Sequence, residues 1–237
     1  PYNIRSVTST YKSLSNFRLF SNVNIQFDSV PNDTTNLLDC RITMRQNDIH
    51  SFTIQAEGTH SDGDLGIKGS LAYGNKNIFH GAETFQLSLK GGLEAQKVIG
   101  KEENQTEKEV FNTRELGVTA SVLFPRFLSP FDFNDFARDY MPTTSVSLGF
   151  NAQIRYHYSR YITMASYGYD WRSRNRLSHT FSPFYLNSVK IADISPVFQA
   201  YLDAEMSQRK KDQYTSHMLL GIRYSFTYNS QRLNQEG

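Results

Sequence analysis

The residues of this chain that could carry out chemistry are six histidines, one cysteine and a glycine-rich stretch. A zinc site would need histidines at metal-ligand spacing such as H-x-x-x-H, and no two of the six show it. A hydrolytic site would need a serine, an aspartate and a histidine to converge at one rim of the fold. We therefore interpret the histidines as polar loop or interior side chains and expect no metal site and no enzyme activity. They are His50, His60, His80, His157, His179 and His217.

The cysteine and the glycines give no stronger signal. Cys40 alone excludes an internal disulfide and an all-cysteine metal site, and we expect it to be a small buried hydrophobic residue. The stretch GDLGIKG at 63–69 is no phosphate loop, because its glycines alternate along a strand and no helix follows them. No nucleotide fingerprint or paired-carboxylate signature occurs elsewhere, so we expect no cofactor.

Composition excludes some partners and favours one class of fold. The 25 basic and 23 acidic side chains leave a formal charge of +2, which provides no field for binding nucleic acid. Only 38% of residues are hydrophobic, yet the chain contains 14 Tyr and 17 Phe. Such a composition is typical of β-structure, in particular of barrels that place aromatic rings at membrane interfaces. No apolar run is long enough to predict a transmembrane helix.

The first 48 residues predict a helix followed by two strands. In SVTSTYKSLSNFRLF at 6–20, apolar residues recur at intervals of three and four, which is the helical period. They are Val7, Tyr11, Leu14, Phe17 and Phe20. Apolar and polar residues alternate over 22–27 and again over 38–45, and each run predicts a strand. A helix and two strands are typical of half of a small α+β module.

From residue 49 the sequence predicts eight strands in succession. At least five of them keep the alternation for about ten residues, whereas soluble strands average ~5–6 and membrane strands need ~9–11. The predicted strands lie at 51–57, 65–73, 85–94, 115–124, 146–158, 161–171, 177–191 and 214–228. We also expect a tight link at Ser159–Arg160 and a short amphipathic helix within 196–211.

Strand length and the polar face favour lipid over water on the apolar side. Lys68, Arg155, His157 and Arg223 fall on the polar side of the strands, which suits a wet lumen. Aromatic residues gather at strand ends, as in an aromatic girdle. They are Tyr156, Tyr158 and Tyr161 at one end, and Tyr167, Tyr169 and Trp171 at the other. We predict an all-β, antiparallel, up-and-down transmembrane β-barrel with about eight strands present; the alternative is a soluble sandwich or lipocalin-like barrel.

Several stretches resemble the BamA/TamA superfamily of outer-membrane assembly and translocation proteins, most closely TamA-like proteins of the surface-antigen type in Bacteroidota. The most specific, EGTHSDGDLGIKGSLAYGNKNIFHGAETFQLSLKGGLEAQ at 57–96, is similar to the start of such a barrel. NFRLFSNVNIQF at 16–27 resembles the end of a POTRA helix and its next strand, and TYNSQ at 227–231 resembles a further family strand. The resemblance implies that 1–48 are the C-terminal part of the last POTRA domain and 49–237 the N-terminal half of the barrel. The earlier POTRA domains and the family's arginine-glycine motif are absent, which is consistent with a truncated portion of a barrel of about sixteen strands.

The resemblance implies a non-enzymatic barrel of the cell outer membrane, with its POTRA part in the periplasm. Such a barrel inserts or exports client proteins through a lateral seam at its first strand, whose unpaired N–H and C=O groups can accept a client strand. The short length of this strand and a break at Gly58 would weaken its pairing. The candidate gate strand is Ser51, Phe52, Thr53, Ile54, Gln55, Ala56, Glu57 and Gly58, and a candidate POTRA edge strand is Asn22, Val23, Asn24, Ile25, Gln26 and Phe27.

The implied partners are outer-membrane lipid, unfolded barrel or exported client proteins and a TamB-like periplasmic protein. Residues 51–58 are equally consistent with an ordinary first strand. Two other functions stay open. A passive outer-membrane channel or porin would conduct solutes constitutively and without the N-terminal module, and a barrel hydrolase would act through His157, His179 or His217.

Overall fold

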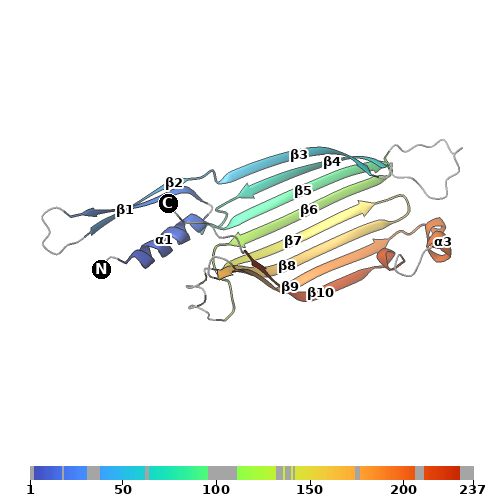
Figure 1. The fold of residues 1–237 in the computed structure, drawn as a ribbon. Helices are drawn as coiled ribbons and strands as arrows, with labels where there is room; N and C mark the ends of the chain where they lie inside the picture. The colour runs from blue at the N-terminus through green and yellow to red at the C-terminus, as the bar shows by residue number, and fades with distance from the viewer. Residues whose placement is uncertain are drawn as a thin grey trace.

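Two sheets account for most of the computed structural model, which describes residues 3–17, 19–30, 38–61, 64–95, 111–131, 136, 140, 142–173, 177–205 and 211–229. One sheet has two strands and the other has eight, and the pairs are antiparallel. Figure 1 shows the eight strands side by side, with the first helix and the small sheet at one end and a second helix at the other. We call these the near end and the far end. The predicted antiparallel β-rich fold is confirmed.

The N-terminal unit consists of α1 (Ile4–Asn16), β1 (Phe20–Ser29) and β2 (Leu38–Gln46). β1 pairs with β2, so that Phe27 lies opposite Cys40. α1 packs against β1, where Val23 is buried, whereas every residue of β2 is exposed. Cys40 is therefore exposed, and the expectation that it would be buried was wrong, because α1 leaves the face of β2 uncovered.

The helix also ends earlier than its apolar spacing predicted. Phe17 N donates to the carbonyl of Leu14 at 3.3 Å, which is the tighter i to i+3 bond of a closing turn. Phe20 then begins β1 instead of continuing the helix, because the alternating sequence that follows it pairs with β2.

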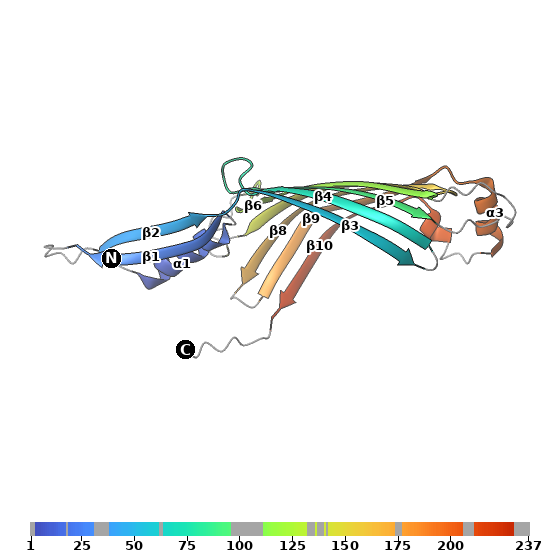
Figure 2. The same cartoon turned by 90° about the horizontal axis from the view of Figure 1, so that it is seen from above.

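The large sheet runs in sequence order, so each strand pairs with the one before it and the one after it. Its strands are β3 (His50–Ser61), β4 (Asp64–Asn75), β5 (Thr84–Ala95), β6 (Thr113–Phe124), β7 (Thr143–Ile154), β8 (Ser159–Ser173), β9 (Leu177–Ala192) and β10 (His217–Tyr228). Figure 2 shows that the sheet is curved, and Figure 1 shows β3 and β10 at its two opposite edges. Among the described strands, β3 pairs with β4 alone and β10 with β9 alone, so both are edges.

Two predicted boundaries were wrong because the alternation of residue types continues through a turn. The strand predicted at 146–158 ends at Ile154, and residues 155–158 form a hairpin turn closed by Arg155 N donating to Tyr158 O at 3.0 Å. Consequently 159–160 begin β8 and are no tight link. Tyr214 lies in a 3-10 helix, η1 (Asp212–Tyr214), rather than in the last strand.

A small hydrophobic cluster lies at the far end, where α3 (Pro196–Glu205) folds against the sheet. Phe198 and Leu202 are each 4% exposed and pack with Tyr158. Phe198 N donates to Ser195 Oγ at 3.3 Å, so Ser195 caps the start of α3. We call α3, η1 and the 155–158 turn the far-end cap. The predicted amphipathic helix is confirmed as far as Glu205, and the remainder of 196–211 up to residue 210 lies outside the described residues.

None of the helices in the described ranges is long and apolar enough to cross a membrane.

Phe198 provides a test of what holds the far-end cap. Phe198→Ala should speed amide hydrogen exchange over residues 197–202 at least tenfold, because truncating a buried phenylalanine costs about 3–5 kcal/mol. Val197→Ala is the matched control, since Val197 is 59% exposed on the same helix and should leave exchange unchanged. Equal exchange in both variants would show that this ring does not hold α3.

Candidate functional site

The two faces of the large sheet carry different kinds of side chain. Residues directly opposite on neighbouring strands project to the same side, so the register assigns each residue to a face. On one side Ile54 lies opposite Leu71, which lies opposite Leu89; we call this the apolar face. On the other, Ser70 lies opposite Gln55 and Lys90; we call this the polar face. The predicted assignment of residues to faces on these strands is confirmed.

The apolar face is exposed over most of its area. Ile54 is 78% exposed, Leu116 67% and Ile222 73%, on three widely separated strands. Soluble monomers rarely expose contiguous apolar patches of more than a few hundred Å². Further exposed members are Phe52, Leu65, Ile67, Leu71, Leu148, Leu220 and Phe226. A surface of this extent requires a cover, which can be lipid or another protein layer.

The apolar residues form a band that crosses the strands obliquely. The register connects Tyr73 on β4, through Leu87, Ala120, Leu148 and Ala165, to Leu186 on β9. Tyr73 is the last apolar residue of β4 at its near end, before Asn75. Leu186, in contrast, is followed toward the far end by Ser188 and Lys190 on the same face. On β10 the apolar residues reach one position farther, to Met218 opposite Ser188, so the far-end limit of the band shifts by six residues between Leu65 on β4 and Met218 on β10.

The size of this shift gives an angle between the band and the strands. Met218 lies in the same row as Leu71 of β4, so the shift from Leu65 is six residues over the six steps from β4 to β10. At ~3.3 Å per residue and ~4.8 Å between strands, this corresponds to strands tilted by about 35° from the perpendicular to the band. Strands of membrane barrels are tilted by ~35–45°, so a layer of uniform thickness would contact a band of this slope.

The polar face has its own contacts between charged and polar groups. Lys68 Nζ lies 3.9 Å from Glu94 Oε1, and Asn151 Nδ2 donates to Glu115 Oε1 at 2.8 Å. The Arg223 guanidinium lies 3.9 Å above the ring of Tyr185. Lys68 and Arg223 thus lie on the face predicted for them, whereas 155 and 157 lie in the hairpin turn.

The candidate gate residues, 51–58, all lie in β3 at the edge of the sheet. Two features of the prediction were wrong. β3 is not short, because it has 12 residues, as many as β4, and its pairing does not stop at Gly58 but continues to Ser61 opposite Asp64. Its position at the edge, rather than a glycine break, leaves its outer N–H and C=O groups without a partner strand in the described part of the chain.

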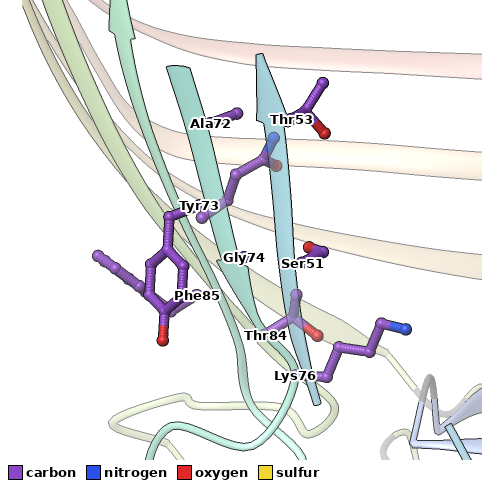
Figure 3. A pocket seen from close by; sticks show the side chains of 9 residues that line it. Ser51, Thr53, Ala72, Tyr73, Gly74, Lys76, Thr84 and Phe85 are labelled. Carbon is purple, nitrogen blue, oxygen red and sulfur yellow. The ribbon is translucent and has the colours of Figure 1, made fainter. Parts of the chain in front are cut away.

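A hollow of about 200 Å³ lies beside β3 at the near end. Figure 3 shows Thr53 and Lys76 on one side of the strands and Tyr73 and Phe85 on the other. The hollow lies over Gly74, which has no side chain; a Cβ there would lie 2.5 Å from Ser51 Oγ. This glycine therefore leaves room on the polar face just inside the open edge.

The candidate POTRA edge residues, 22–27, lie in β1. β1 pairs with β2 on one side, and no other described strand occupies its second side. Val23, Ile25 and Phe27 are buried or half-buried, while the polar residues between them are exposed. The prediction that these residues form a strand with an open edge agrees with this arrangement, and its role in binding stays a prediction.

Aromatic rings gather on the apolar face at the near end. Tyr169 donates to the carbonyl of Leu128 at 2.8 Å, and its ring lies 4.5 Å from that of Phe127. Trp171 stacks on His179 with centroids 4.9 Å apart. Amphipathic rings of this kind are enriched where a membrane barrel meets the headgroups.

The histidines contact neighbours of several kinds. His50 and His179 each lie within 2.9 Å of a tyrosine hydroxyl, on Tyr73 and Tyr224 respectively. Within the described ranges, no three metal-ligating side chains come together. His157 Nδ1, however, lies 3.1 Å from Ser195 Oγ, the serine–histidine contact that a hydrolase would need.

The His157–Ser195 pair is better explained as part of the far-end cap. Ser195 Oγ already accepts from Phe198 N, and its own N–H donates to His157 O at 2.8 Å. Burial lowers the pKa of His157, so the ring is neutral at pH 7. Its Nε2 has no partner within the described part of the molecule, whereas a triad would place a carboxylate on the ring nitrogen that does not face the serine.

One cluster was not predicted from the sequence. Arg155 and Arg160 lie together at the far end, on either side of the hairpin turn. The signal that could have located them is the turn itself, but RYHY at 155–158 contains neither glycine nor proline and continues the alternation of the strand.

Comparison with protein-family models gives no match, and no curated protein matches the sequence. The function is therefore inferred from the two faces of the sheet and from its edges.

The open edge of β3 makes a specific prediction for hydrogen exchange. In an edge strand, alternate N–H groups point away from the neighbouring strand. We therefore expect alternating fast and slow exchange along 51–58, measured on the full-length protein in detergent. Residues 145–152 of β7 should be protected uniformly, because β7 pairs on both sides. Uniform protection of β3 would mean that its outer edge is covered.

Proposed function

We propose that residues 49–237 form part of a transmembrane β-barrel of the outer membrane, with the apolar face against lipid and the polar face toward water. The observation that supports this most strongly is the oblique far-end limit of the apolar band, from Leu65 on β4 to Met218 on β10, whose slope is that of tilted membrane strands. The near-end aromatic rings and the charged groups of the polar face agree with the same orientation.

The N-terminal unit fits a periplasmic module joined directly to the barrel. The order helix, strand, strand of α1, β1 and β2 is that of half a POTRA domain, and β2 leads into β3 at the near end. We assign residues 1–48 to this module. Its open strand β1 would bind a client or a TamB-like partner by strand addition.

Within this class we propose assembly or translocation of client proteins, as the TamA-like resemblance implies. A client strand would pair with the open edge of β3, gaining main-chain hydrogen bonds along its length. The hollow over Gly74 would receive one of its side chains on the polar face. This role requires no catalytic residue and no cofactor.

A passive channel is the second candidate, and the polar face supports it. Lys68, Glu94 and Arg223 provide the charged lining that a conduit for solutes would use. The two functions differ in what they require of β3. A channel needs a closed wall with constitutive solute conductance, and a translocation barrel needs an edge that can open.

Opposite faces of β7 test the membrane assignment. Leu148 is 60% exposed within the apolar band, and its neighbour Ser147 lies on the polar face. Leu148→Arg should lower the free energy of folding into lipid vesicles by about 2–4 kcal/mol, as for arginine near the bilayer midplane, and Ser147→Arg should have little effect. If both variants fold equally well in a urea titration, the apolar face does not contact lipid.

Crosslinking tests the role of β3. Thr53→Cys or Gln55→Cys, at the open edge, should crosslink to a nascent barrel client during its assembly, and Ser147→Cys, on the polar face of an internal strand, should not. A channel would give no crosslink at either place while retaining conductance. Absence of crosslinks at β3 during normal client assembly would contradict the translocation role.

A further inference from the structure

Two arginines lie close together at the far end, Arg155 in the hairpin turn and Arg160 at the start of β8. Gln153 lies directly opposite Arg160 in the β7–β8 pair, and Arg155 follows two residues after Gln153. Arg155 N donates to Tyr158 O at 3.0 Å, which extends the β7–β8 pairing by one step, and diagonal neighbours across such a pair are roughly 7–8 Å apart. The charges of both arginines also act on Tyr214. The stems of Arg155 and Arg160 therefore start close enough for both guanidinium groups to reach one small ligand.

Neither arginine is neutralised by a carboxylate. Among the described residues no acidic group forms an ion pair with Arg155 or Arg160. Glu115, opposite Gln153 on the next strand, is bonded to Asn151, and Asp203 of α3 lies 3.6 Å from Lys211. Two neighbouring cations without an anion repel each other, which is unfavourable beside the hydrophobic cluster of the cap.

The arginines also have hydrogen-bonding capacity that the protein leaves unused. Nε of Arg155 and Nε of Arg160 are both buried, and neither has an acceptor in the portion of the chain that is described. More than nine-tenths of buried polar groups in native structures have a partner. Two such donors in one cluster leave hydrogen-bonding capacity for an added acceptor.

The tyrosines of the far-end cap surround the two arginines with hydroxyl donors and with aromatic rings of low polarity. Tyr158 is 8% exposed, and its ring has two close neighbours. The Arg155 guanidinium lies 5.6 Å from the centroid of the Tyr158 ring, and the centroid of the Tyr214 ring lies 5.4 Å from that of Tyr158. Burial raises the pKa of Tyr214 and nearby Tyr158 adds to this, while the charges of the two arginines oppose it. The phenol of Tyr214 thus keeps its proton and can donate to an anion.

We propose that Arg155, Arg160 and the Tyr214 hydroxyl form a binding site for an oxyanion, and that its ligand is a phosphate or a phosphate monoester. A guanidinium donates two parallel hydrogen bonds to two oxygens of a phosphate. A tetrahedral phosphate presents separate oxygen pairs to two arginines, whereas one carboxylate presents a single pair. The site lies away from the edge of β3 and does not depend on the translocation role. In the proposed membrane orientation it would lie at the surface-facing end, where either a lipid headgroup or a soluble phosphate could supply the ligand.

Titration with inorganic phosphate tests the site in the full-length protein in detergent, with calorimetry as the readout. Wild type should bind saturably, and Arg155→Gln or Arg160→Gln should each weaken binding about tenfold or more, the loss expected for a hydrogen bond to a charged group. Arg172→Gln is the matched control, because Arg172 lies on the same strand near its other end and is exposed. It should bind phosphate as wild type does.

Further variants guard against misfolding and identify the source of the phosphate. Arg155→Lys keeps the positive charge but cannot donate two parallel hydrogen bonds to one phosphate. Its affinity for phosphate should therefore lie between those of wild type and Arg155→Gln, and amide hydrogen exchange over residues 197–202 should be unchanged. If phosphatidic acid in phosphatidylcholine nanodiscs competes with inorganic phosphate for the site, the ligand is a lipid headgroup. If it does not compete, the ligand is a soluble phosphate. The proposal is overturned if wild type does not bind phosphate saturably, or if Arg172→Gln weakens phosphate binding as much as the other two variants do. Neither outcome would bear on the membrane assignment or on the role of β3.

Discussion

The pairing register of the eight strands is the constraint on which the rest of the structure depends. Because side chains alternate with a period of two, a slip of one residue between two strands would move all apolar residues of one strand to the polar face. In the pairs from β3 to β8 the register keeps Leu71, Leu89 and Val118 in line without interruption. Among the described strands of the large sheet, the register shifts only later, between Tyr167 and Tyr169 and between Gly221 and Arg223. The opposite characters of the two faces follow from this alignment.

Gly66 and Gly74 on β4 make room for side chains of the neighbouring strands and do not break β4. A Cβ on Gly66 would lie 2.6 Å from Thr59 Oγ1 and 3.0 Å from Glu94 Cγ. Gly66 and Gly74 both face the polar side, so side chains from the neighbouring strands can lean over β4. Gly58, by contrast, has nothing within 4 Å of where a Cβ would be, and it interrupts no pairing. Crowding on the polar face, and not bending at the edge, explains Gly66 and Gly74.

Alternation along the chain was enough to predict the strands and their two faces, because the period of two is a local property of the sequence. It was insufficient where a boundary depends on non-local pairing. Tyr156 and Tyr158 continue the pattern of β7, yet the chain turns there because β8 pairs back from Ser159. Whether Cys40 is covered depends on where α1 packs, and the convergence of Arg155 with Arg160 depends on that same turn. The strand boundary, the exposure of Cys40 and the convergence of the two arginines cannot be predicted from the spacing of residues along one strand.

The even number of strands has a topological consequence. β3 begins at the near end and β10 runs back to it, so the chain enters the sheet at His50 and leaves it at Tyr228 on the same side. In the proposed membrane orientation, eight strands in this order could insert as four hairpins, and the far-end connection of each hairpin would enter the membrane first. The segments flanking the sheet then stay in the compartment from which insertion starts. In the proposed membrane orientation the far-end connections would cross the hydrocarbon first, and the one between β9 and β10 contains α3 and its buried rings.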